Sequence, residues 1–151
     1  MSQANFIMNT TKPIFIAGIV KSPSELKQAM ALRHVVFVEE QSIDEQEEYD
    51  GLDDSSLQFV VKKAGQVIGT ARVRFVTGDF AKIERMAVLK VFRKQGAGKT
   101  LLTFILAHVE ASQVMLHAQW TAVPFYKACG FKEMNGPFVE AGIKHIKMVK
   151  G

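Results

Sequence analysis

The sequence has one cysteine, Cys129, among its 151 residues. One thiol excludes an internal disulfide and a cysteine-based zinc site. Long apolar runs are also lacking, since no stretch approaches the roughly 20 residues that a membrane-spanning helix needs. Residues 1–12 have no basic segment followed by a long apolar run, which excludes a signal peptide. These absences predict a cytoplasmic protein that has no membrane partner.

The composition is that of an ordinary globular protein, with 48% hydrophobic and 23% charged residues. A chain of this length can bury most of the apolar surface that its unfolded form exposes. No internal repeat, linker or low-complexity tract interrupts it. We therefore expect residues 1–151 to form a single domain.

The net charge of +4 hides an uneven distribution along the chain. Residues 39–54 contain nine acidic residues and no basic one, whereas residues 62–99 contain ten basic residues and two acidic ones. The acidic segment suits attraction of a cationic substrate or is simply a solvated surface, and both interpretations stay open. The basic segment suits a phosphate-bearing ligand. Nucleic acid is not the expected partner, because only three phenylalanines are interleaved with these basic residues.

Hydrophobic patterns and turn residues predict alternating strands and helices. Ser22-Pro23-Ser24-Glu25 has the spacing of a helix N-terminal cap, and Lys63-Ala64-Gly65-Gln66 is typical of a hairpin turn. We expect strands at residues 13–20, 57–61, 67–76, 82–89 and 114–118, helices after residue 22 and at 101–109 and 122–129, and one or two last strands within 138–149. This order predicts a mixed α/β layout with antiparallel strands in the first half.

The run from Arg93 to Thr100 ends in Gly-Ala-Gly-Lys-Thr and at first suggests a nucleotide-binding loop. A Walker A motif would need a glycine at position 93, where the chain has Arg93, so a kinase or NTPase is disfavoured. Gly96 and Gly98 still let the backbone turn sharply next to a ligand. The helix that follows offers free N–H groups and its positive dipole end. The run therefore predicts an anion site of another kind.

Residues 83–88 followed by Arg93 to Gly98 resemble the acetyl-coenzyme A motif [Arg/Gln]-x-x-Gly-x-[Gly/Ala] of the GNAT superfamily of N-acetyltransferases. Residues 124–131 (Pro-Phe-Tyr-Lys-Ala-Cys-Gly-Phe) are similar to a helix end of that family. The segments 33–41, 118–119 and 138–148 are similar to the ElaA/YjcF-like branch. The resemblance thus covers nearly the whole chain.

The resemblance implies an α+β fold with a mostly antiparallel sheet of six or seven strands, splayed between the fourth and fifth strands and flanked by about four helices. It implies transfer of an acetyl group from acetyl-coenzyme A, without a metal, to the primary amine of a small molecule or peptide. The alternative is a non-catalytic coenzyme A sensor of the same fold. The sequence does not identify the amine or the preferred acyl chain, and it leaves open whether the chain forms a homodimer.

The resemblance also implies which residues hold the cofactor. The backbone of Met86 and Val88, with Ala87 between them, pairs with the pantetheine arm, and the N–H of Val88 faces the developing oxyanion. Phe125 belongs to the same site. The pyrophosphate is cradled by Arg93, Lys94, Gln95, Gly96, Ala97, Gly98, Lys99 and Thr100.

Tyr126 is the predicted general acid, because a phenol suits protonation of a departing thiolate of similar basicity. Cys129 lies three residues further along, which raises the question of an acyl-cysteine intermediate. No histidine lies near Cys129 in the sequence. Direct attack of the amine on the thioester is therefore the expected route.

Glu84 is the predicted general base, since it alternates onto the same strand face as Met86 and Val88. The alternative is that Glu84 pairs with its basic neighbours. His117, Glu140 and His145 are other candidates, and water-mediated deprotonation is also open.

Overall fold

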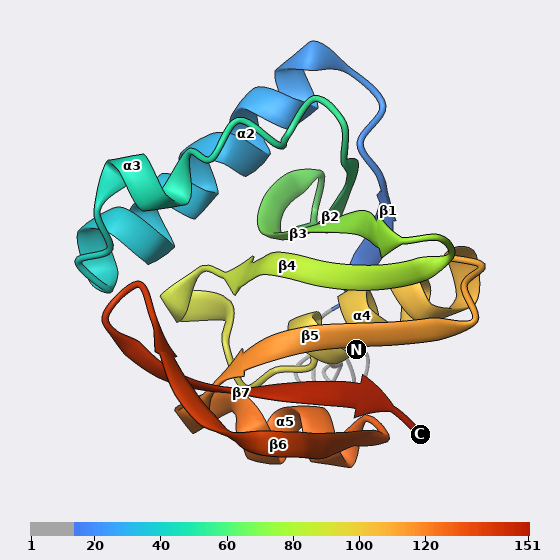
Figure 1. Cartoon of the computed structure of the whole chain (residues 1–151). Coiled ribbons are helices and arrows are strands. Elements are labelled where there is room, and N and C mark those ends of the chain that lie inside the picture. Colours follow the sequence, from blue (N-terminus) through green and yellow to red (C-terminus); the bar gives the residue numbers. More distant parts are fainter. Residues whose placement is uncertain (1–13) are drawn as a thin grey trace, which may run out of the picture.

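The structure, a computed structural model, describes residues 14–151 of the chain. It contains a seven-stranded sheet with strand order β1-β2-β3-β4-β5-β7-β6 (Figure 1). Neighbouring strands pair antiparallel, except that β4 and β5 are parallel. The strands are β1 (Ile16–Ile19), β2 (Leu57–Lys63), β3 (Gln66–Thr77), β4 (Phe80–Val88), β5 (Gln113–Gln119), β6 (Phe131–Glu140) and β7 (Ile143–Lys150).

Four α-helices flank the sheet: α2 (Pro23–Arg33), α3 (Glu45–Glu48), α4 (Ala97–His108) and α5 (Val123–Ala128). Helix α2 lies on one side, and α4 and α5 lie on the other (Figure 1). Each side has its own buried apolar cluster. Ala29, Leu32 and Val36 pack on Val60 and Val67 of the sheet. The larger cluster joins α4 and α5 to the opposite face, through residues such as Leu101, Leu102, Ile105, Phe59, Ile83 and Leu116. The predicted α+β fold is confirmed.

The local signals in the sequence explain several element boundaries. The Ser22 hydroxyl accepts a hydrogen bond from the N–H of Glu25 at 3.1 Å, so the predicted cap is present. Ala64 and Gly65 both have positive φ, which is the geometry of a tight hairpin turn between β2 and β3. The first predicted strand included Pro13, which, like the signal-peptide prediction for residues 1–12, lies outside the described residues.

Two segments differ from the prediction. After α2 the chain continues as a π-helical segment, His34–Glu40, which the apolar spacing alone did not indicate. Strand β6 begins at Phe131, whereas the predicted last strands began at residue 138. Residues 135–137 are Asn-Gly-Pro, a composition typical of a turn. In the structure Asn135 has a positive φ and the register with β7 shifts between Met134 and Phe138, so this part of the strand is irregular.

The splay between β4 and β5 is the feature that positions the site. The two strands pair only from Phe80↔Gln113 to Ile83↔Leu116 and then separate. A bulge follows at once in β4, where Arg85 has a φ of 53° and the register with β3 shifts. The predicted splay between the fourth and fifth strands is therefore confirmed.

Candidate active site

A cavity of about 550 Å³ lies where β4 and β5 separate. Its walls come from the π-helical segment, the bulged half of β4, the end of β5 and the β6–β7 hairpin. Six predicted site residues line it: Glu84, Met86, Ala87, Val88, Arg93 and Tyr126. The other general-base candidates, His117, Glu140 and His145, line it as well.

Beyond Ile83 the backbone of β4 has no strand partner on its β5 side. The N–H of Leu89 pairs with the carbonyl of Ile68 on β3 at 2.9 Å. Since backbone groups alternate in direction along a regular strand, the N–H and carbonyl of Val88 point away from β3 into the gap. Met86 lies within the bulge and lines the same cavity. The Val88 carbonyl accepts a hydrogen bond from the Arg93 Nε at 2.8 Å. This is the edge that could pair with an extended amide chain.

The loop before α4 has the geometry of an anion site. Lys94 and Gly96 have φ values of 63° and 99°, so the backbone is in the left-handed region at two positions just before the helix begins at Ala97. Gly96 provides no side-chain cap for the first helical N–H groups. Among residues 14–151 the first intrahelical bond at this end is from Thr100 N to the Gly96 carbonyl, at 2.9 Å. The free N–H groups and the helix dipole therefore favour a negatively charged ligand.

Gly98 has a packing role in addition to the role expected from the sequence. A Cβ at this position would lie 3.3 Å from the ring of Phe125 and 3.7 Å from the Met86 Cε. The first turn of α4 can approach α5 and β4 this closely because Gly98 has no side chain. Phe125 thus supports the loop from behind, next to Tyr126.

The π-helical segment connects both sides of the splay. Glu40 binds both Nη atoms of Arg93, at 2.6 and 2.8 Å. Gln41, which follows, exchanges two amide hydrogen bonds with Gln119 at the end of β5, at 3.2 and 2.8 Å. The Arg93 guanidinium, expected near the pyrophosphate, is therefore engaged by Glu40 and Val88. The sequence pattern of the branch included Gln41 and Gln119, but nothing in it indicated that they pair.

Tyr126 lies at the back of the cavity, on α5. Its side chain is packed between Phe125 and Phe131, and its hydroxyl lies 3.5 Å from the Met86 Sδ. Burial raises the pKa of Tyr126 well above the ordinary value of 10.0. The phenol therefore keeps its proton at neutral pH and can donate it to a leaving group beside Met86.

Glu84 does line the cavity, but its carboxylate is already bound by cations. Arg72, Arg74 and Lys82 lie at 2.8, 2.8 and 3.2 Å from its oxygens, and its side chain is 7% exposed. Burial opposes ionisation, but these three cations outweigh it and lower the pKa of Glu84 to about 2. A carboxylate this weakly basic is a poor proton acceptor at neutral pH. The structure thus favours the alternative that Glu84 pairs with its basic neighbours.

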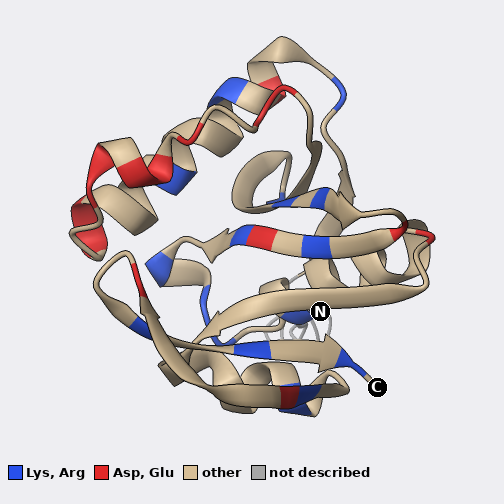
Figure 2. Cartoon of the chain, in the orientation of Figure 1, with Lys and Arg blue, Asp and Glu red and all other residues tan. Residues whose placement is uncertain are grey.

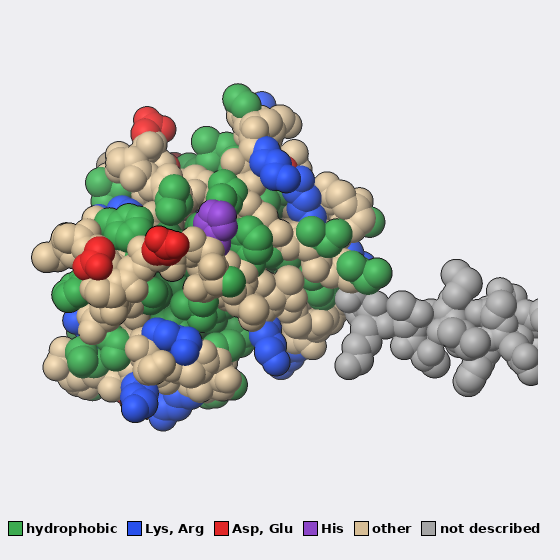
Figure 3. All heavy atoms as spheres, turned by 90° about the vertical axis from the view of Figure 1, so that its right-hand side faces the viewer, with side chains coloured by type: hydrophobic (Ala, Val, Ile, Leu, Met, Phe, Trp, Pro, Cys, Tyr) green, Lys and Arg blue, Asp and Glu red, His purple; other side chains and the backbone are tan. Residues whose placement is uncertain are grey.

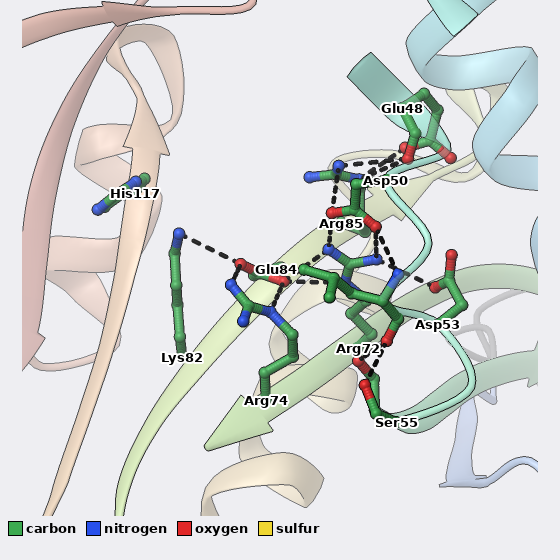
Figure 4. Close-up of polar contacts among 12 residues, drawn as sticks. Glu48, Asp50, Asp53, Ser55, Arg72, Arg74, Lys82, Glu84, Arg85 and His117 are labelled. Atoms are coloured by element: carbon green, nitrogen blue, oxygen red, sulfur yellow. Dashed lines mark hydrogen bonds and ion pairs between the residues drawn. The ribbon is translucent and has the colours of Figure 1, made fainter. Parts of the chain in front are cut away.

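Most of the buried charge around the cavity belongs to one ionic network (Figure 4). Acidic residues gather around α3, whereas basic and acidic residues alternate along β4 (Figure 2). The centre of the network is formed by two arginines that are almost fully buried, Arg33 and Arg72. The acidic segment supplies their partners: Glu48 and Asp53 bind Arg33, and Asp50 and Asp53 bind Arg72. The charges of these three carboxylates are therefore compensated inside the protein. This pairing argues against the interpretation that they attract a cationic substrate.

Basic residues of the segment 62–99 are largely paired too. Carboxylates bind Lys62, Arg72, Arg74, Lys82, Arg85 and Arg93. On the face shown in Figure 3, basic, acidic and hydrophobic side chains are interspersed. The positive charge of this segment is thus used mainly within the fold.

The network predicts a loss of stability in acid. A folded-state pKa of about 2 for Glu84, below its ordinary 4.5, means that the unfolded chain binds the proton more tightly. This contribution, on the order of 3 kcal/mol, is complete above about pH 5 and is lost as the pH falls toward about 2. Urea unfolding over this range should show it. Glu110→Gln, at an exposed position, should behave as the wild type, and a Glu84→Gln protein with an equally steep decline would contradict the assignment.

Two further sequence expectations concern Cys129 and metal ions. Burial raises the pKa of the Cys129 thiol, so little thiolate forms at neutral pH, and the side chain packs against the larger apolar cluster. Within residues 14–151, no group of three or more His, Cys, Asp or Glu side chains is arranged to hold a metal ion. No helix of this part of the chain is long and apolar enough to span a membrane.

Residues 23–151 match the family described as the acetyltransferase (GNAT) domain. YjcF of Bacillus subtilis, described as an uncharacterized N-acetyltransferase, is 38% identical over 138 residues, covering 89% of this chain and 98% of YjcF. The crystal structure of Escherichia coli ElaA has a TM-score of 0.78 at 26% identity, covering 91% of this chain and 100% of ElaA. An aminoglycoside 6'-N-acetyltransferase complexed with coenzyme A shares the fold, with a TM-score of 0.71 at 15% identity, covering 89% and 96%.

The fold and the matched family define the class of protein. The chain belongs to the GNAT family of acetyltransferases. Within that family, its likeness to YjcF and ElaA places it in the ElaA/YjcF-like branch.

Proposed function

We propose that the protein transfers an acetyl group from acetyl-coenzyme A to a primary amine by direct attack of the amine on the thioester. One observation carries the proposal: the part of β4 that has no partner on β5 lies between Tyr126 and the uncapped start of α4, because Met86 is next to both the Tyr126 hydroxyl and Gly98. An extended pantetheine arm would pair with this edge while its pyrophosphate meets the N–H groups at Ala97 and Gly98. The complex of a distant fold neighbour with coenzyme A supports the choice of cofactor.

The chemistry follows from the groups around the thioester. The N–H of Val88 points into the gap and would donate to the carbonyl oxygen as it becomes an oxyanion. The Tyr126 hydroxyl lies beside Met86 and would protonate the thiolate as the C–S bond breaks. No cysteine needs to carry the acyl group. The charged residues around Glu84, on the side of the cavity that the amine would enter, are paired with one another. We therefore expect the shape of these walls, rather than net charge, to select the amine.

Thermal unfolding tests the cofactor. Acetyl-coenzyme A and coenzyme A, at about a hundredfold excess over Kd, should each add about 2.7 kcal/mol of stability, or a rise of roughly 5–10 °C in Tm. ATP with Mg²⁺ and single-stranded DNA should leave Tm unchanged. A Lys94→Glu/Lys99→Glu variant should lose most of the shift, because repulsion replaces attraction at the loop, whereas Lys27→Glu on α2 should keep it.

Thiol release over a panel of primary amines, namely benzylamine, tyramine, putrescine and glycinamide, tests the reaction. Turnover that depends on an amine is the expected result. A shift by ATP with Mg²⁺ alone would overturn the cofactor assignment. Stabilisation by both coenzyme A forms without turnover on any of the amines would favour the non-catalytic sensor.

A further inference from the structure

The first residues beyond the last β4–β5 pair are Glu84 and His117. The strands are parallel and in register up to Ile83↔Leu116, so the next residue on each strand projects from the same face. Figure 4 shows His117 on β5, across the opening from Lys82 and Glu84 on β4. Both side chains line the cavity that would hold the thioester in the proposed reaction. The position thus offers two candidate proton acceptors.

His117 differs from Glu84 in having an unused basic atom. Its Nδ1 lies 3.1 Å from a carboxylate oxygen of Glu140, at the end of β6. A hydrogen bond from His117 lowers the pKa of Glu140, so Glu140 stays ionised and accepts the Nδ1 proton. This arrangement leaves the lone pair on Nε2, which has no partner within residues 14–151. His117 is half-buried and faces the cavity.

The surroundings hold the imidazole in place. The ring of Phe138 packs edge-on against it, with centroids 4.9 Å apart. The charged and titratable groups around it are Glu140 from β6, Lys82 from β4, and Lys147 and His145 from β7. Lys147 is the cross-strand partner of His117, and the His145 Nε2 lies 3.9 Å from the second oxygen of Glu140. Glu140 thus balances the neighbouring positive charge and orients the imidazole through its Nδ1.

We propose that His117 is the general base that deprotonates the acceptor amine, and that Glu140 is the residue that positions it. This inference rests on the proposed function and specifies the group that the sequence left open. The base thus comes from β5, because the carboxylate across the opening on β4 is bound by Arg72, Arg74 and Lys82.

The proton balance requires such a base. A primary amine with a pKa near that of lysine, about 10.4, arrives as an ammonium ion, and His117 Nε2 accepts one proton from it. The nitrogen then bonds to the thioester carbon while the C=O electron pair moves to oxygen. The pair returns as the C–S bond breaks, and the sulfur takes a proton from Tyr126. The second proton of the nitrogen replaces the one that Tyr126 lost, so the products are the amide, the thiol and one proton that His117 releases to solvent.

The test measures kcat/KM by thiol release as a function of pH, with the most active amine of the panel. His117→Ala should lower kcat/KM by about 10²-fold at neutral pH and remove the acid limb of the profile. Added imidazole should restore part of the activity. Glu140→Gln should lower kcat with KM unchanged, because His117 loses the carboxylate that accepts its Nδ1 proton and fixes its tautomer. Both variants should keep the wild-type Tm shift with acetyl-coenzyme A, as should the control His34→Gln, which should also keep full activity.

The outcomes separate this inference from the function on which it rests. An active wild type together with a His117→Ala protein that keeps the acid limb would overturn the base assignment and leave the function intact. A His117→Ala protein that binds acetyl-coenzyme A but gains nothing from imidazole, while Glu84→Gln loses the acid limb, would return the role to Glu84. A wild type without turnover on any of the amines would overturn the proposed function itself.

Discussion

Replacing Tyr126 with phenylalanine is expected to lower kcat by about 10²-fold, because the departing thiolate loses its proton donor. The change removes one oxygen from a side chain that packs between Phe125 and Phe131. The ring contacts remain, so the fold and the binding of acetyl-coenzyme A should be preserved. The measurement is single-turnover and steady-state thiol release, together with the Tm shift produced by acetyl-coenzyme A.

The chain contains a matched control. Its other tyrosine, Tyr49, is exposed and bonds to His34 at 3.0 Å, outside the strand gap. Tyr49→Phe should leave kcat unchanged. Equal rates for the wild type and Tyr126→Phe, with chemistry limiting in both, would show that the thiolate leaves without help from this phenol.

Arg72→Met is expected to destabilise the protein by about 3 kcal/mol, the low end of the range for breaking a buried ion pair. Arg72 is 0% exposed and binds Asp50, Asp53 and Glu84. Its loss leaves three carboxylates with less compensation than their burial requires. The effect stays near the low end because each of these carboxylates keeps another arginine, namely Arg85 for Asp50, Arg33 for Asp53 and Arg74 for Glu84. Equilibrium unfolding in urea at neutral pH measures it.

Arg74→Met provides the comparison on the same strand face. Arg74 is partly exposed and shares Glu84 with Arg72 and Lys82, so its removal should cost less than about 1 kcal/mol. Equal losses for the two variants would mean that burial does not determine the contribution of these arginines. A Tm shift with acetyl-coenzyme A that survives Arg74→Met would confirm that the cofactor side is independent of the network.

Local sequence patterns determined much of the fold because the signals act over a few residues. The cap at Ser22 and the turn at Ala64-Gly65 occur where the pattern predicted them. The pattern failed at Asn135 and its neighbours in β6, because pairing with β7 up to Met134 and again from Phe138 continues the strand across an irregularity of turn-like composition. It also missed the π-helical segment, which depends on how the chain after α2 packs on the sheet.

The candidate site divides in the same way. The loop from Lys94 to Gly98 and the position of Tyr126 follow from contiguous motifs, because each motif contains the atoms that form its part of the site. The pairing of charges does not follow from any contiguous motif. Residues 39–54 look like a negatively charged surface in the sequence, but Glu48, Asp50 and Asp53 compensate buried arginines from other elements.

The sequence by itself determined the family, the candidate phosphate loop and the candidate acid, since these depend on residue types at short spacing. The preference for His117 over Glu84 as the proposed base depends on the tertiary structure. Glu84 and His117 lie on opposite sides of the opening because β4 and β5 are in register up to the splay, and their hydrogen-bond and ionic partners come from β3 and β6. Electrostatic interactions depend on distance and burial, so the roles of these two residues depend on which strands lie next to them.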